Sequence, residues 1–307
     1  MQTYIAEKAV SKVADKLDGD ITFEKVHFKP FTTFVLKNVT IVDRNPYVDP
    51  SDSAFVKVDT FFRAEYVIAK FSLEGLTRHE GIHLDRAFID NAQMNLVIES
   101  KPVEGKREKS PNNLSRIFGL KKPEKPKVNE KEIFHIKKVE IKDMGFAMKN
   151  HTTGRDGHPE GGINWDDLDI RGIDLRANGL KFKGGIMSSE VTSLSFHEKS
   201  GYTVEKMSGS AKVGRGRTIV EDLHIDDLWS DVHLPLFMMS YDNIKAFQDF
   251  LGQVKIDGNI AESSLDFQTI SYFAPTLRGN HLNAVISGHI SGVINDFSFT
   301  NIAINST

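Results

Sequence analysis

Residues 54–66 read AFVKVDTFFRAEY, and this stretch decides the fold class. From Ala54 to Ala64 every second residue is apolar or is threonine, whereas charged residues such as Lys57 and Asp59 lie between them. A period of two places apolar side chains on one face of a β-strand and charged side chains on the other. We therefore predict a strand with one apolar face.

The same alternation recurs along most of the chain. It predicts strands over residues 82–89, 92–98, 133–232 and 265–304, while residues 67–80 are typical of a short helix or a loop. Most of the protein is therefore expected to be β-structure.

Two segments have helical spacing instead. Residues 1–19 predict an amphipathic helix that ends at Gly19, and residues 241–251 predict a short internal helix that ends at Gly252. Two such helices cannot cover the apolar side of so many strands. Either two sheets pack face to face as a sandwich, which the pattern alone favours, or one long sheet curls and lines a groove.

Composition divides the chain between residues 101 and 132, where ten Lys or Arg residues occur among glutamates and prolines. The predicted organisation is a capping helix (1–19), a first β-segment (20–100), a basic linker or insertion (101–132) and a second β-segment (133–307) that we expect to be truncated at its C-terminal end. A solvated loop is the simplest account of the basic segment, with one helical turn possible over residues 113–120.

The composition excludes several classes of protein. The net charge is −3, which gives no basic surface for nucleic acid, and the chain has no cysteine, which excludes disulfide frameworks and thiolate metal sites. Phenylalanine is abundant, with 21 residues against 6 Tyr and 2 Trp. Aromatic area without a polar group favours dry apolar surface over polar recognition.

The most conspicuous motif is HEGIH at residues 79–83, a literal H-E-x-x-H. Zinc proteases need both histidines on one helical face, but Gly81 interrupts the motif and a period-two strand begins at Ile82. We therefore predict a solvated loop here and no metal site.

Other catalytic motifs are absent or incomplete. GRGR at residues 214–217 precedes a strand instead of a helix, and the aspartates near 166–169 and 226–231 lack the spacing of a calcium loop. We predict a non-enzymatic protein with no cofactor and no catalytic residue.

Three stretches resemble the N-terminal part of TamB proteins, members of the AsmA-like superfamily. The first comprises residues 2–17 together with ITFEKVHF (21–28) and LKNVTIVD (36–43). The second is LSFHEKSGYTVEKMSG (194–209), and the third is ISYFAPTLRG (270–279) followed by LNAVISG (282–288) and ISG (290–292).

The resemblance implies a fold and a place in the cell. Members of the family have one helix in the inner membrane, a long periplasmic β-structure folded lengthwise into a taco-like apolar groove, and a C-terminal domain that engages an Omp85-type outer-membrane barrel. For this chain it implies a mainly β fold, a long curled antiparallel or mixed sheet with an N-terminal amphipathic helix and one short internal helix. We expect the membrane helix and the barrel-binding domain to lie outside this chain.

The function implied is a periplasmic segment of a bridge that conducts phospholipids between inner and outer membranes. Its partners would be phospholipid acyl chains, the inner membrane and the Omp85-type barrel, with no nucleic acid. The residues expected to line the groove follow from face alternation: Val56, Val58, Phe62, Met94, Leu96, Ile98, Val139, Ile141, Phe146, Met148, Leu180, Phe182, Leu194, Phe196, Ile286 and Ile290.

A β-bulge reverses face assignments, and we predict one at Asp143, because the apolar register changes there from odd to even positions. Two other functions remain open at this point. The chain could be an assembly factor that offers strand edges to outer-membrane proteins, or a β-sandwich binding module.

Overall fold

The computed structural model describes residues 17–29, 32–44, 60–72, 81–98, 100–103, 106–109, 112–118, 131–151, 161–214, 216–242, 250–279, 282–293 and 296–306. Most of the predicted helix at residues 1–19 and residues 243–249 of the predicted internal helix lie outside these ranges. In the described part of the chain, no helix has both the length and the apolar character needed to span a bilayer.

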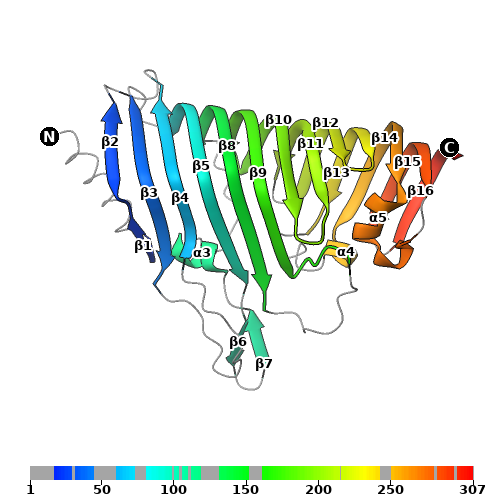
Figure 1. The fold of residues 1–307 in the computed structure, drawn as a ribbon, viewed down its shortest axis with the longest axis horizontal. Coiled ribbons are helices and arrows are strands. Elements are labelled where there is room, and N and C mark those ends of the chain that lie inside the picture. The colour runs from blue at the N-terminus through cyan, green and yellow to red at the C-terminus, as the bar shows by residue number, and fades with distance from the viewer. Residues whose placement is uncertain are drawn as a thin grey trace.

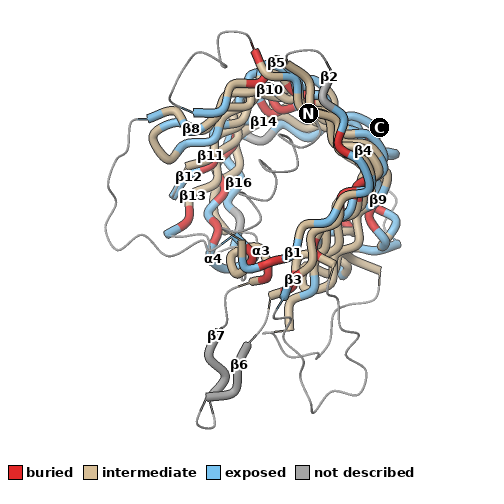
Figure 2. The backbone as a smooth tube through the Cα atoms, turned by 90° about the vertical axis from the view of Figure 1, so that its left-hand side faces the viewer, coloured by how far each residue is buried: buried red, intermediate tan, exposed pale blue. Residues whose placement is uncertain are grey.

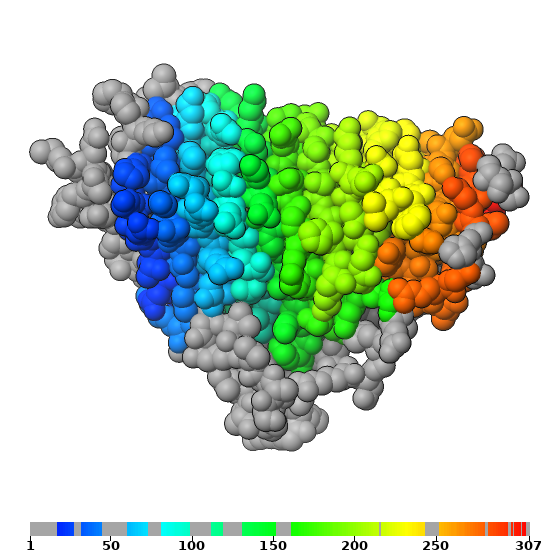
Figure 3. Space-filling model, viewed as in Figure 1, coloured from blue at the N-terminus to red at the C-terminus, as the bar shows by residue number. Residues whose placement is uncertain are grey.

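The molecule is built on a single mixed sheet of 14 strands, which follow one another along its long axis (Figures 1 and 3). The sheet order is β1-β3-β4-β5-β8-β9-β10-β11-β12-β13-β14-β15-β16, and β2 pairs with β3. Its strands are β1 (Gly19–Thr22), β2 (Lys25–Lys29), β3 (Thr33–Asp43), β4 (Thr60–Phe71), β5 (Ile82–Ile98), β8 (Glu132–Asn150), β9 (Asp167–Lys183), β10 (Ile186–Glu198), β11 (Thr203–Val213), β12 (Arg217–Asp227), β13 (Asp231–Ser240), β14 (Lys255–Asp266), β15 (Asn283–Val293) and β16 (Asp296–Ser306).

Neighbouring strands of this sheet are antiparallel except β5 and β8, which pair in parallel from Ile82↔Phe134 to Ile98↔Asn150. A parallel pair needs a long connection that returns the chain to the same end of the sheet. The predicted basic segment makes this connection. Its described part contains the hairpin of β6 (Ser100–Val103) and β7 (Lys106–Lys109) and the helix α3 (Asn113–Ile117), which agrees with the helical turn expected there.

Helix α3 lies beside the end of β5 on the side of β4, where the β4–β5 pairing ends at Phe62↔Met94 while β5 continues to pair with β8. The Asn113 side chain accepts a hydrogen bond from the Val97 backbone N–H (3.0 Å) and donates one to the Asn95 carbonyl (2.8 Å), as a neighbouring strand would. Ile117 is completely buried, and Arg116 donates to the Asp43 carboxylate at the end of β3 (3.0 Å). This helix therefore closes a gap in the sheet.

The long strands are bent, so that an end-on view shows them following a curved path (Figure 2). Left-handed backbone conformations mark several irregularities: Asn38 has φ of 52°, Asn91 46°, Asp143 49° and Asp222 54°. Asparagine and aspartate tolerate this region better than other side chains, and bulges increase the local twist and bend a strand. Polar residues inside otherwise alternating strands thus mark where the sheet curves.

A small helix covers one end of the sheet near β10 to β13. Helix α5 (Phe267–Phe273) brings Tyr272 and Phe273 against Tyr202, with ring centroids 5.5 and 5.2 Å apart. Burial raises the pKa of the Tyr202 hydroxyl, and the nearby Asp227 carboxylate raises it further. The turn η2 (Pro275–Leu277) follows α5, and the helix α4 (Phe250–Gln253) precedes β14.

Several predictions are confirmed and others are wrong. The mainly β fold, the long mixed sheet and the bulge at Asp143 are confirmed. The sandwich is wrong for the described residues, because they form one long sheet and a two-stranded hairpin with no second layer facing the sheet. Residues 67–71 continue β4 instead of forming a helix or loop, residues 82–98 form one strand instead of two, and α5 and η2 interrupt the strand expected over 265–304.

Candidate functional site

The most extensive feature of the sheet is an unbroken row of apolar side chains across ten strands. Residues directly opposite each other on paired strands point to the same face. Successive pairings join, from β2 to β13, Val26, Leu36, Val67, Ile89, Ile141, Leu175, Leu194, Met207, Ile225 and Val232. The sheet therefore carries a continuous apolar stripe at right angles to its strands.

A second row lies on the same face beyond the bulges. Met94 lies opposite Phe62 on β4 and Phe146 on β8, and Phe146 lies opposite Ile170 on β9. Asn91 and Asp143 lie between the two rows and have positive φ, and at Asp143 the pairing of β8 with β9 also shifts register. We call the face that carries both rows the apolar face.

The structure places the predicted groove residues in the described chain within strands of the large sheet. Leu96 pairs with Met148, Phe182 stacks on Phe134 with a centroid distance of 5.9 Å, and Ile290 lies opposite Gly258. Val56 and Val58 lie outside the described residues. The other members with their pairings are Ile98 beside Asn150, Val139 beside Ala177, Leu180 beside Ile136, Phe196 beside Val204, and Ile286 beside Ser263.

The apolar face is half-buried. Of the 14 described groove residues, 13 are intermediate in exposure and only Val139 counts as buried, at 9%. A closed core would bury most of them fully, and a flat uncovered face would leave many fully exposed. Neither is the case here, although no second sheet layer covers this face within the described ranges.

The opposite face is charged and more exposed. Lys138 and Lys142 of β8, which alternate with Val139 and Ile141, are exposed, as are Arg86 of β5 and Arg176 of β9. The two faces therefore differ in both chemistry and accessibility, and the apolar face is the one that could hold an apolar ligand.

Sequence reasoning included only Ile141 and Leu194 of the first row among the groove residues and missed the other eight. Leu36, Val67 and Met207, for example, alternate as expected for a strand, but their place in the row depends on pairing partners far away in the chain. One signal in the sequence could have found them. A pair of polar residues such as Asp90-Asn91 separates a stretch with apolar residues at odd positions from one with apolar residues at even positions.

The structure places the histidines of the H-E-x-x-H motif differently from a zinc protease. His79 and Glu80 lie outside the described residues. His83 lies in β5, as the strand predicted from residue 82 implies, but it is half-buried instead of solvated. His83 is directly opposite His135 of β8. Strand geometry, not a helical turn, sets the neighbours of His83.

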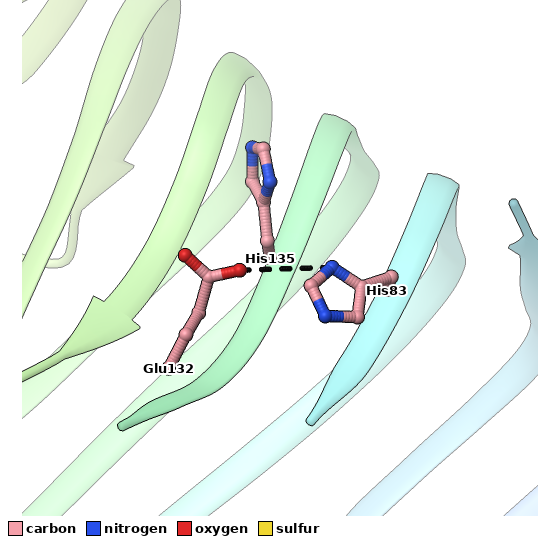
Figure 4. Close-up of side chains that lie close together, drawn as sticks. All are labelled: His83, Glu132 and His135. Carbon is pink, nitrogen blue, oxygen red and sulfur yellow. Dashed lines mark ion pairs between the residues drawn. The ribbon is translucent and has the colours of Figure 1, made fainter. Parts of the chain in front are cut away.

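Glu132 completes a group with these two histidines (Figure 4). Its Oε1 lies 3.6 Å from His83 Nδ1, and its Oε2 lies 2.8 Å from the Lys181 ammonium. The hydrogen bond from Lys181 is the main cause that lowers the pKa of the Glu132 carboxyl. Lys181 thus already neutralises the carboxylate of this group.

Comparisons of the chain with models of protein families, with curated proteins and with solved structures found no match.

Proposed function

We propose that this protein is a non-enzymatic lipid carrier whose apolar face forms a taco-like groove for phospholipid acyl chains. The observation that carries the proposal is the row of ten aliphatic side chains across ten strands, uncovered by a second layer in the described chain. Such a face runs along the long axis of the molecule. An acyl chain bound at one end of the face would therefore find equivalent apolar contacts further along the face.

The energetics explain why a passive face would suffice. A phospholipid has roughly 30 methylenes, and each loses about 0.8 kcal/mol on leaving an apolar environment for water, or about 25 kcal/mol in total. Side chains such as Ile141, Leu175 and Leu194 remove much of this barrier by contact alone. Because these contacts are not directional, an acyl chain can slide from one strand to the next without chemistry or a cofactor.

The pattern of exposure supports a concave apolar face. On a curved sheet, side chains on the concave side crowd together and shield one another, whereas those on the convex side spread apart. Half-buried apolar residues opposite exposed lysines at positions 138 and 142 are what a sheet curled toward its apolar side would have. The lipid head group would then stay in water along the open side of the curl.

The resemblance to TamB proteins extends this proposal. It suggests a periplasmic segment of a bridge between two membranes, tethered to the inner membrane and connected to an Omp85-type barrel by segments outside this chain. Two of the three resembling stretches cover the β10–β11 hairpin and the region from α5 to β15.

One observation favours a second function. β16 lies at the end of the strand order, and its Phe299 and Ile304 side chains are each 63% exposed. An apolar edge strand is a template for another strand. An assembly factor for outer-membrane proteins would use this edge to pair with a client.

The test is to place a charge on the apolar face and measure bound lipid. Leu194→Glu introduces a carboxylate into the middle of the first row, and Thr192→Glu adds the same charge at an exposed position of the same strand. Phospholipid that co-purifies with the protein would be quantified by native mass spectrometry and lipid extraction, and folding would be checked by circular dichroism.

We expect the Leu194→Glu protein to remain β-folded and to lose its bound phospholipid, while the Thr192→Glu protein keeps both. Unfolding of Leu194→Glu alone would identify a closed core and contradict the proposal. Binding of unfolded outer-membrane protein strands by a wild-type protein that carries no lipid would favour the assembly factor.

A further inference from the structure

A second group of metal-ligating side chains lies on the charged face, away from the apolar face. His224 of β12 and His233 of β13 are directly opposite each other, and their rings stack with centroids 3.8 Å apart and planes 13° apart. Their neighbours Leu223 and Ile225 belong to the apolar side of β12. The two imidazoles therefore project from the opposite surface as a parallel pair.

A carboxylate lies beside both rings. Asp222 Oδ1 is 2.9 Å from His233 Nε2 and 3.4 Å from His224 Nε2. Asp222 takes the left-handed conformation, with φ of 54°, at a register shift on β12, and this bulge turns its side chain toward the histidine pair. One oxygen and two nitrogens thus converge from two strands.

These separations match those of a metal coordination sphere. Zinc bonds of about 2.0–2.1 Å at tetrahedral angles place two ligand atoms about 3.3 Å apart. The distances of 2.9 and 3.4 Å from the Asp222 oxygen to the two histidine nitrogens are close to that separation. From this geometry we propose that Asp222, His224 and His233 bind a divalent transition-metal ion, with Zn²⁺ as the preferred ion and water completing its coordination.

The chemistry of the group favours this class of ion. Imidazole nitrogens suit Zn²⁺, Cu²⁺ and Ni²⁺ better than the harder Ca²⁺ and Mg²⁺, which prefer oxygen ligands. The Asp222 carboxylate adds an anionic oxygen to the two imidazoles, a ligand type that Zn²⁺ also accepts. The Asp222 side chain is 77% exposed, which leaves room for water or for a ligand from another molecule.

The group around Glu132 is the less suitable of the two. The distance of 3.6 Å between His83 Nδ1 and Glu132 Oε1 is longer than the separation expected for two ligands of one zinc ion. The ammonium of Lys181 lies 2.8 Å from the same carboxylate and would repel a cation. Asp222 has two histidine partners and no lysine or arginine among its ion pairs in the described chain.

The experiment is a zinc titration of the untagged full chain after treatment with EDTA. Isothermal calorimetry with ZnCl₂ gives the affinity, and elemental analysis after buffer exchange gives the stoichiometry. We expect about one tightly bound Zn²⁺ per chain, and a higher melting temperature in its presence, because the metal binds the folded state preferentially. No retained zinc in the wild-type protein would overturn the proposal.

Variants identify the site. His224→Ala, His233→Ala and Asp222→Asn should each weaken zinc binding by at least about tenfold, since loss of a direct ligand exceeds the 10–100-fold effect of outer-shell changes. Asn also tolerates the left-handed backbone, so Asp222→Asn tests the charge without straining the bulge. Circular dichroism confirms that each variant is folded.

His289→Ala is the matched control, because His289 also lies near one carboxylate, with Nε2 3.5 Å from Asp257 Oδ2, but has no second histidine in that pair. It should bind zinc like the wild type. Equal loss in His289→Ala would mean that histidines bind zinc without a defined site. Loss in His83→Ala with retention in His224→Ala would assign the metal to the Glu132 group and overturn the proposal.

Discussion

Ile141 and Met144 of β8 point to the same face of the sheet, although they are three residues apart. Asp143 between them has φ of 49°, and the pairing with β9 shifts register from Ile141↔Leu175 to Met144↔Ile173. In a regular strand these two side chains would lie on opposite faces. The apolar residues of β8 change from odd to even positions at Asp143, and the bulge keeps them on one face of the sheet.

The first prediction concerns this bulge. Asp143→Val should lower the free energy of unfolding by about 1–2 kcal/mol, because a β-branched side chain is strained in the left-handed region. Asp143→Gly should be neutral or slightly stabilising, since glycine adopts this conformation without strain. Urea denaturation of both variants measures the difference.

Asp143 is exposed, so lost packing does not explain a difference between the two variants. If valine were tolerated as well as glycine, the left-handed conformation would not hold the register of β8. In that case the shared face of Ile141 and Met144 would need another explanation.

A second prediction separates an open apolar face from a closed core. Ile141→Ala should cost about 1–2 kcal/mol in the free energy of unfolding, less than a core truncation, because Ile141 is only half-buried. Ile117→Ala should cost about 2–5 kcal/mol, because Ile117 of α3 is completely buried. Thermal or urea unfolding of lipid-free protein compares the two.

Lipid-free protein is essential to that comparison, since a bound ligand would itself stabilise the folded state. Equal losses for Ile141 and Ile117 would indicate that the apolar face is packed like an interior and would argue against the groove.

A third prediction tests how α3 closes the sheet. Asn113→Ala should destabilise the protein by about 1–3 kcal/mol, because it leaves the Val97 N–H and the Asn95 carbonyl without their partner at a buried position. Asn113 is only 2% exposed, so water cannot readily replace it. Hydrogen exchange of the Val97 amide should accelerate in the variant.

Asn112→Ala is the comparison for that experiment. It removes the N-cap bond to the Ser115 N–H but leaves β5 untouched. It should weaken the helix without exposing the Val97 amide to faster exchange. Faster exchange in both variants would mean that the whole helix, and not the Asn113 amide group, protects this edge.

A fourth prediction concerns pH. The Lys181 ammonium lowers the pKa of Glu132, so this pair stabilises the folded state above the unfolded pKa of about 4.3 and loses its effect as pH falls through the lower folded value. Lys181→Gln should cost about 0.2–1 kcal/mol at pH 7, the range of partly exposed ion pairs. The difference from the wild type should shrink as pH falls from about 5 to 3.

Denaturant titrations at several pH values follow this difference. Lys199→Gln, which removes the ion pair with Asp167 at a separate place on the sheet, provides the comparison for general charge effects. A Lys181→Gln loss that stays constant down to pH 3 would show that Lys181 acts through packing and not through its charge on Glu132.

The class of fold could be read from the sequence with considerable success. Alternation in stretches such as residues 92–98 predicted strands with one apolar face, and the parity change at Asp143 predicted its bulge. These signals are local, because side-chain alternation and left-handed conformations depend on neighbouring residues only. They were sufficient to place Met94 and Phe146 at apolar positions of their strands, which the structure pairs with each other.

Only the tertiary structure decided how many layers the sheet has and which residues meet across it. The parallel pairing of β5 with β8 joins Ile89 to Ile141 across the basic segment, and the β12–β13 pairing stacks His224 on His233. Pairing partners depend on the register between strands that are distant in the chain. A shift of one residue would have turned every one of these side chains to the other face.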